Sequence, residues 1–232
     1  SLTIKTRKEA AFMGMRRFSI QNPRTSGRSH KDILFSQILK KYGVLGANIF
    51  FARHSRNGKD MGLVLVEEIP TKEFLERYGR RNGPVFRFSE SKFNSLEATF
   101  STKNAHQWAG HFEQAPFSLM FDRKAVNSSM VTEASKTLMR KFILDQVDAS
   151  EIFDAEKWAI FVLLSEIYGA DHGLDWMNMR LYFNPITLKF EPISWNPLPI
   201  RWKAAARTSL INKDELLGHP NIIKRIFSSP VM

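Results

Sequence analysis

Residues 154–193 read DAEKWAIFVLLSEIYGADHGLDWMNMRLYFNPITLKFEPI, and this stretch decides the fold. Asp154 suits a helix N-cap, and the apolar residues that follow it on nearly every helical face predict a helix as far as Tyr168, buried at the centre of a lobe. A polar loop comes next. Two β-rich runs, Met179–Phe183 and Leu188–Ile193, then flank an Asn-Pro turn. A buried helix, a polar loop and a strand pair therefore follow one another in that order.

The first third of the chain predicts a smaller, β-rich unit. Short apolar runs within residues 1–29 predict two strands, and helical spacing of apolar residues predicts a helix over His30–Tyr42. Two β-rich runs, Asn48–Ser55 and Met61–Glu67, flank Asn57-Gly58, which is a strong signal for a hairpin turn. The remaining expected elements are a short helix Lys72–Tyr78, a strand Pro84–Phe88, a long helix Val131–Gln146 and a helix Asn221–Phe227.

These elements predict an α+β fold in a single domain that spans residues 1–232. We expect a small β-rich lobe over about residues 1–88 and a larger, mainly helical lobe over 89–232 that carries the polar loop and its hairpin. The hydrophobic content of 43% is enough for a substantial core. The chain starts abruptly in a strand-like run, which is typical of a domain cut from a longer protein. Its most apolar run, Trp158–Leu164, is far shorter than the roughly 20 residues of a membrane span, so no transmembrane segment is expected.

The net charge of +11 favours an anionic partner, such as a nucleotide, an acidic protein surface, a nucleic acid or a phospholipid surface. The chain contains no cysteine, which excludes disulfides, thiolate zinc sites and a cysteine nucleophile. It also contains neither of the two common glycine-rich phosphate loops, G-x-G-x-x-G and G-x-x-x-x-G-K-[ST]. The first residues have no secretory signal, and nothing in the sequence indicates a compartment.

The polar loop places two carboxylates, an imidazole and an amide close together in the sequence, on Asp171, His172, Asp175 and Asn178. Hard cations such as Mg²⁺ take oxygen ligands, and phosphoryl transfer needs a metal ion together with a carboxylate that orients the attacking hydroxyl. Such a loop is equally compatible with a capped, solvated connection that has no chemical role. Spacing alone leaves both interpretations open.

Three blocks of the chain carry a resemblance to a known family. They are MGMRRFSIQNP at Met13–Pro23, NGKDMGLVLVE at Asn57–Glu67, and NMRLYFNP at Asn178–Pro185 followed by FEPI at Phe190–Ile193. In this order they resemble the CotH kinase family, which is named after a spore coat protein. The resemblance extends over roughly the whole chain. It implies an atypical protein-kinase fold that binds ATP with Mg²⁺ and phosphorylates protein hydroxyls.

The resemblance also implies roles for individual residues. The catalytic-loop Asp falls on Asp171 or Asp175, with His172 in the same loop, and an amide metal ligand falls on Asn178. The family's second metal-binding Asp corresponds to Asn196, which keeps a carbonyl oxygen but loses the negative charge. Because charge is a main determinant of affinity for hard cations, this departure predicts a weakened metal site.

The resemblance further implies contacts with the nucleotide in the small lobe. Lys5 is the first candidate for a phosphate-binding cation and Arg17 the second, since a Lys on a strand can act as a point charge on phosphate. The segment that contains Glu67, Glu68 and Ile69 resembles a kinase hinge whose backbone meets adenine. The alternatives are a solvated strand face for the cations and a plain strand end for the hinge.

Three functions follow from this sequence. The first is ATP- and Mg²⁺-dependent phosphotransfer to Ser or Thr hydroxyls of a protein substrate, impaired by Asn196. The second is a non-catalytic, pseudokinase-type module that binds a nucleotide or an acidic partner. The third and weakest is a basic domain that binds nucleic acid through the clusters Arg16/Arg17, Arg24/Arg28 and Arg77/Arg80/Arg81. The clusters lack the regular aromatic interleaving of a platform for single strands.

Overall fold

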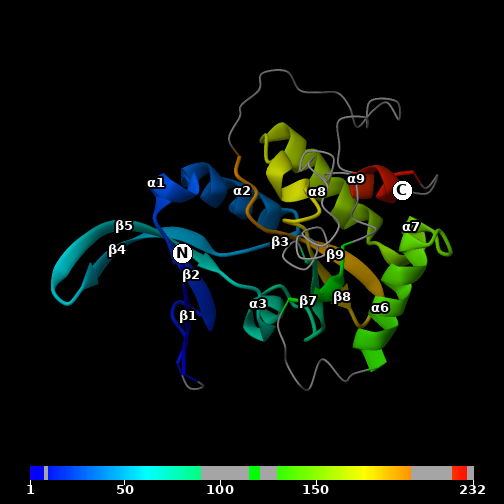
Figure 1. The fold of residues 1–232 in the computed structure, drawn as a ribbon, viewed down its shortest axis with the longest axis horizontal. Helices are drawn as coiled ribbons and strands as arrows, with labels where there is room; N and C mark the ends of the chain where they lie inside the picture. The colour runs from blue at the N-terminus through cyan, green and yellow to red at the C-terminus, as the bar shows by residue number, and fades with distance from the viewer. Residues whose placement is uncertain (8–9, 90–114, 121–129, 200–220, 229–232) are drawn as a thin grey trace, which may run out of the picture.

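The computed structural model of the chain describes residues 1–7, 10–89, 115–120, 130–199 and 221–228, and the structural statements below concern these residues. They form a mixed α/β architecture with two sheets (Figure 1). The first sheet is antiparallel, in the order β1-β2-β5-β4, and consists of β1 (Leu2–Lys5), β2 (Arg17–Gln21), β4 (Ile49–Arg56) and β5 (Lys59–Glu68). The two early strands and the hairpin expected from the sequence are confirmed.

Strands β4 and β5 form a long hairpin whose tip projects from the body of the molecule (Figure 1). Its turn residues Asn57 and Gly58 have φ values of 52° and 76°. Both angles lie in the left-handed region that a type I′ turn requires and that Asn and Gly tolerate best. At its other end, β5 lies between β2 and β4, so its backbone is paired on both sides there.

The second sheet differs most from the sequence-based expectation. Its order is β3-β9-β8-β6-β7, and it consists of β3 (Leu45–Gly46), β6 (Val85–Phe88), β7 (Phe117–Leu119), β8 (Arg180–Asn184) and β9 (Lys189–Ser194). Strand β3 runs parallel to β9, and the other pairs are antiparallel. The strand expected at Pro84–Phe88 pairs with β8 in this sheet, and Phe86 and Phe88 are buried in the main core.

The helices are α1 (Pro23–Ser26), α2 (His30–Lys41), α3 (Lys72–Arg77), α6 (Met130–Ile143), α7 (Ala149–Ile152), α8 (Ala155–Ile167) and α9 (Asn221–Ile226), with a short 3₁₀ helix η3 (Asp171–Leu174). The helices expected from the sequence lie close to their predicted positions, whereas α1, α7 and η3 were not expected. Side chains cap both long central helices: Ser29 and Asp32 form a capping box on α2, and Asp154 caps α8. Within the described ranges, no helix is long and apolar enough to cross a membrane.

Helix α8 joins the helical layer to the second sheet through Trp158. The side chain of Trp158 is fully buried, and its indole N–H donates to the carbonyl oxygen of Phe190 on β9 at 3.0 Å. Its ring meets that of Phe153 edge-on, with centroids 5.5 Å apart. The helix is not buried all round, however: Leu163 and Ile167 are about half exposed, at 48% and 56%. The apolar sequence of α8 therefore predicts more burial than the structure shows.

Helix α2 packs against both sheets. Phe35 and Leu39 belong to the main core beneath the second sheet, whereas Ile33 packs against the cluster formed by Ile49 and Leu65 of the first sheet. At Gly46, a Cβ atom would lie 2.9 Å from the hydroxyl oxygen of Ser36 on α2, so only glycine fits this close approach. The helix is therefore the element through which the two sheets share one framework.

Two apolar side chains of α8 that differ in burial, Trp158 and Leu163, give a matched test of this packing. Replacing buried Trp158 with Ala should lower the free energy of unfolding by about 3–5 kcal/mol, because it opens a cavity and removes the bond to Phe190. Replacing half-exposed Leu163 with Ala should cost less than about 1 kcal/mol. Urea unfolding of both variants checks the difference. Equal losses would contradict the burial of Trp158 at the centre of the lobe.

Candidate functional site

A buried arginine lies where elements of both sheets meet. Arg28 sits between the left-handed Gly27 that ends α1 and the cap of α2, and it is only 4% exposed. Its guanidinium binds Glu67 on β5 and Asp32 on α2, each at 2.8 Å. A buried guanidinium between two buried carboxylates is costly to desolvate and needs both partners in place. The three groups therefore fix the position of α2 against the first sheet.

From Arg28 a line of polar contacts runs to the segment after β9 and on to η3. The Nη1 of Arg28 donates to Oδ1 of Asn196 at 3.0 Å, and Nδ2 of Asn196 donates to Oδ1 of Asn178 at 3.4 Å. The Nδ2 of Asn178 lies 2.9 Å from the carbonyl oxygen of His172 and 3.1 Å from its ring Nε2. The other ring nitrogen of His172 is 3.4 Å from Asp175. We call these five residues, Arg28, Asn196, Asn178, His172 and Asp175, the polar chain.

The polar chain unites most of the residues singled out in the loop. Asn178 and Asn196, the two expected amide ligands, are in contact, and His172 and Asp175 adjoin them. Asp171, the other candidate for the catalytic Asp, is exposed at the start of η3. Its side chain therefore faces solvent, outside the line of contacts.

The two expected phosphate-binding cations lie on the first sheet. Lys5 and Arg17 are directly opposite each other on β1 and β2. Lys5 is exposed on the edge strand, and Arg17 is half-buried. No contact between Lys5 and the polar chain occurs in the part of the chain that the structure describes.

Two of the expected hinge residues, Glu67 and Glu68, have different charged partners. Neighbouring side chains of a strand point to opposite faces, so Glu67 meets Arg28 while Glu68 forms an ion pair with Arg77. The backbone N–H groups of Glu68 and Ile69 already donate to carbonyl oxygens of the adjoining strands, at 2.8 and 2.9 Å. An adenine ring at this point would have to replace those bonds.

Burial and neighbouring charges shift the pKa values in the group around Glu68. Burial raises the pKa of Glu68, and the positive charge of Arg77 opposes that rise. Burial likewise lowers the pKa of Lys40, against the influence of Glu68. Glu68, Arg77 and Lys40 therefore form a separate, partly buried cluster beside β4, distinct from the polar chain.

The oxygen atoms of the polar chain interact with other side chains of the protein. Both amide oxygens, on Asn178 and Asn196, accept hydrogen bonds from other side chains. Of the carboxylates in or beside the polar chain, Asp32 and Glu67 are paired with Arg28, and Asp175 lies 3.4 Å from a ring nitrogen of His172. Among the described residues, no three His, Asp or Glu side chains gather as metal ligands would. What the arrangement offers instead is a guanidinium, compensated by two carboxylates, next to two amides.

Arg28 is the functional residue that sequence reasoning missed, because it was grouped with Arg24 as part of a basic surface cluster. Two features of the sequence point to its burial. Asp32 follows it by four residues, the spacing of an ion pair on one face, and Glu67 stands at the end of a strongly apolar strand that a charge can enter only with a partner.

Removing the charge of Arg28 tests whether the polar chain depends on it. Arg28→Met keeps most of the side-chain volume but leaves Asp32 and Glu67 buried without a cation, and should lower the free energy of unfolding by about 3–5 kcal/mol. The matched control is Arg53→Met, which breaks an ion pair with Asp60 in which Arg53 is 82% exposed, and should change stability little. Urea unfolding at pH 7 measures both. A mild effect of Arg28→Met would mean that this ion-pair group does not hold the two sheets.

Comparisons with known proteins add no relative to this description. No protein-family model matches the chain, and no curated protein matches it significantly. The resemblance to the CotH kinases thus rests on the three sequence blocks alone, and functional inference has to start from the geometry of the polar chain.

Proposed function

We propose that the chain is a kinase-like module that binds a nucleotide without catalysing phosphotransfer. The observation that carries the proposal is the 3.0 Å hydrogen bond from Arg28 to Asn196. In the family that the sequence resembles, the position of Asn196 holds a metal-binding Asp. Here an amide stands at that position and a guanidinium faces it. A fixed cation thus occupies the neighbourhood in which a kinase would hold Mg²⁺.

The positive charge beside Asn196 is compensated within the protein. Arg28 contributes one positive charge, and its partners Asp32 and Glu67 contribute two negative ones, both engaged at 2.8 Å. Mg²⁺ demands near-octahedral oxygen ligands and gives up its water shell reluctantly, so two hydrogen-bonded amides are poor ligands for it. A nucleotide would rely on hydrogen bonds from the amides and on the overall positive charge of the chain, which is +11.

Mg²⁺-dependent phosphotransfer to protein Ser or Thr hydroxyls is the second candidate. One observation favours it: the ring of His172 lies between Asp175 and Asn178, which orients these polar groups beside Asn196. In that case Asp175 or the exposed Asp171 would orient the substrate hydroxyl. The second candidate requires metal ligands beyond the amides of the polar chain.

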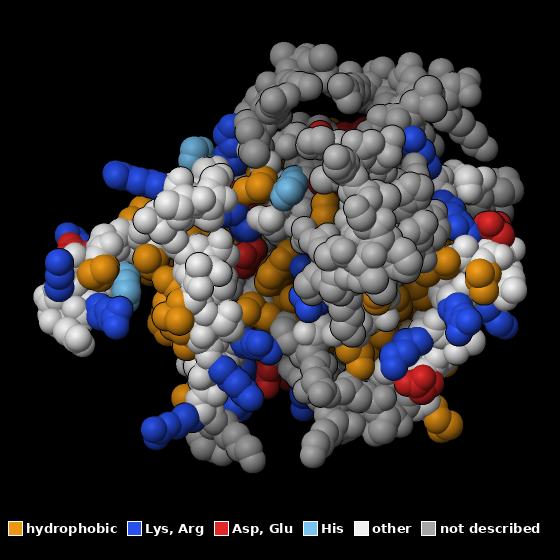
Figure 2. Space-filling view, viewed as in Figure 1, with side chains coloured by type: hydrophobic (Ala, Val, Ile, Leu, Met, Phe, Trp, Pro, Cys, Tyr) orange, Lys and Arg blue, Asp and Glu red, His pale blue; other side chains and the backbone are white. Residues whose placement is uncertain are grey.

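Nucleic-acid binding has weaker support. Three arginines of the basic clusters form ion pairs: Arg16 with Glu73, Arg77 with Glu68 and Arg80 with Glu191. A fourth, Arg28, is buried between carboxylates. Figure 2 shows Lys and Arg side chains distributed over several parts of the visible face, the projecting hairpin among them. A scattered distribution of this kind does not trace the path of a phosphate backbone.

Isothermal titration calorimetry with ATP, in Mg²⁺ and in excess chelator, separates the candidates. The proposed module should bind ATP in both conditions with affinities that agree within about threefold, because its cation is built in. Phosphate incorporation into a general protein substrate should be absent. Binding that requires Mg²⁺, together with phosphate transfer that is lost in Asp171→Ala or Asp175→Ala, would establish the kinase instead. Absence of binding in both conditions would overturn both candidates.

Asn196→Asp tests the role assigned to the substituted position. The new carboxylate adds a negative charge beside the amide of Asn178 and should increase the apparent affinity for Mg²⁺, measured in the presence of ATP, by about tenfold, or about 1.4 kcal/mol. Asn57→Asp adds the same charge at the tip of the hairpin, far from the polar chain, and serves as the control. If both variants show the metal dependence of the wild type, Asn196 does not face a metal position.

A further inference from the structure

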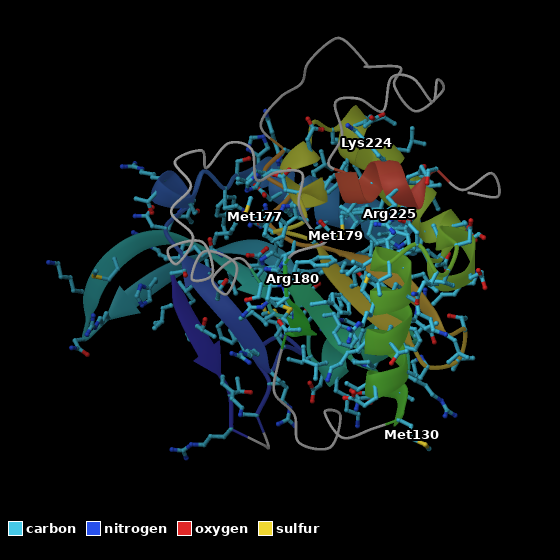
Figure 3. The ribbon with its side chains drawn as sticks, turned by 45° about the vertical axis from the view of Figure 1, so that its right-hand side comes forward. Met130, Met177, Met179, Arg180, Lys224 and Arg225 are labelled. Carbon is cyan, nitrogen blue, oxygen red and sulfur yellow. The ribbon has the colours of Figure 1, made fainter. Side chains whose placement is uncertain are left out.

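Two arginines face each other across neighbouring strands of the second sheet. In the antiparallel pair β6 and β8, Arg87 stands directly opposite Arg180. Side chains of such directly opposed residues lie on the same face of the sheet at close range, and like charges in that position destabilise the pair. Figure 3 places Arg180 near the middle of the molecule, close to Met177 and Met179. Their opposition therefore places two positive charges within the body of the fold.

Among the described residues, no carboxylate forms an ion pair with either arginine. Arg180 is only 7% exposed, and its Nη1 donates to the carbonyl oxygens of Met177 and Met179 at 3.0 and 2.9 Å. The Nε groups of Arg87 and Arg180 are both buried without an acceptor. Across the described ranges, neither forms an ion pair, and Glu67, which acts on Arg180 electrostatically, is already bound to Arg28. Two guanidinium groups thus retain unused hydrogen-bond donors.

The surroundings leave the charge of Arg180 uncompensated. Burial lowers the pKa of Arg180 to about 10, and the neighbouring charge of Arg87 contributes to the shift, with Glu67 opposing it. At pH 7 the group therefore remains protonated. The ring of Trp195, 5.3 Å from the guanidinium carbon, holds the side chain in place but supplies no negative charge. An anion bound here would satisfy the free donors and offset the repulsion within the pair.

We propose that Arg87 and Arg180 form a binding site for a tetrahedral phosphate oxyanion. Guanidinium groups present planar forks of donors that match phosphate oxygens, and two forks side by side can bind one phosphoryl group from two directions. Arg180 lies two residues from Asn178 and stacks on Trp195, which precedes Asn196, so the arginine pair adjoins the polar chain. The identification of the phosphate as that of a nucleotide rests on the function proposed above. The site itself can be tested with inorganic phosphate.

Arg87→Gln is the decisive variant, because the side chain of Arg87 makes no hydrogen bond within the described structure that the change would remove. Without phosphate, the variant should unfold at the same temperature as the wild type or higher, since it relieves the repulsion with Arg180. In calorimetry with inorganic phosphate, it should bind at least about tenfold more weakly than the wild type. Arg87→Lys, which restores the charge, should recover part of the affinity.

Two controls make the result specific. Arg53→Gln removes an exposed charge of the hairpin and should leave phosphate binding unchanged. Phosphate should also raise the unfolding temperature of the wild type more than sodium chloride of equal ionic strength does, because only a bound ligand stabilises by mass action. Equal effects of the two salts, or unchanged phosphate affinity in Arg87→Gln, would overturn the site.

Competition identifies the source of the phosphate. ATP, but not adenosine, should displace inorganic phosphate from the wild type if the site holds a nucleotide phosphate. Phosphate binding that depends on Arg87 and is not displaced by ATP would keep the oxyanion site for free phosphate and overturn nucleotide binding. ATP binding that is indifferent to Arg87→Gln, in a protein that binds no inorganic phosphate, would keep the nucleotide module and overturn the arginine site.

Discussion

The ion-pair group around Arg28 is the constraint on which the rest of the structure depends. A guanidinium that is 4% exposed can remain charged in the interior only if its partners compensate the loss of water, and those partners lie on a helix, on a strand of the first sheet and in the segment that follows β9. Each partner therefore has to be delivered by correct folding of a different element. Buried charges of this kind favour one arrangement of the elements over others that would bury the same apolar surface.

The same group connects fold to chemistry. Through Asn196 it fixes the amide of Asn178, and through Asn178 it fixes the orientation of His172. A site whose side chains are already hydrogen-bonded to one another is preorganised for binding, because little side-chain freedom remains to be lost. Such a site is poorly suited to a metal ion, which would have to displace the internal partners of both amides. Binding and catalysis thus make opposite demands on these residues.

Local patterns in the sequence were enough to predict most of the longer helices and strands. Helical spacing and the Asp154 cap located α8, and Asn57-Gly58 located the hairpin. The sequence did not indicate β3 and β7, which have two and three residues and are too short to show a period. It also could not assign β6 to the second sheet, since that assignment depends on pairing with β8, nearly 100 residues further along the chain. Pairing partners across such separations are set by the tertiary fold.

In the candidate site, too, local features could be predicted from the sequence and long-range contacts could not. The loop residues were recognisable because they are close in sequence, and the amides of Asn178 and Asn196 do meet. The role of Arg28 was not recognisable, because two of its three partners, Glu67 and Asn196, are 39 and 168 residues away and its charge alone suggested a surface position. The pairing of Arg87 with Arg180 was hidden for the same reason. Residue type reveals chemical capacity, whereas burial and long-range neighbours decide how that capacity is used.

The short parallel pairing of β3 with β9 joins the segment before β4 of the first sheet to the end of the second sheet. Gly46 pairs with Ser194, two residues before Asn196, and the same Gly46 is pressed against Ser36 on α2. Three residues after Gly46, the chain enters β4 of the first sheet. Asn196 is therefore connected to β9, β3 and α2, and through them to the base of the projecting hairpin, by backbone pairing and close packing. The segment after β9 and the base of that arm belong to one continuous framework.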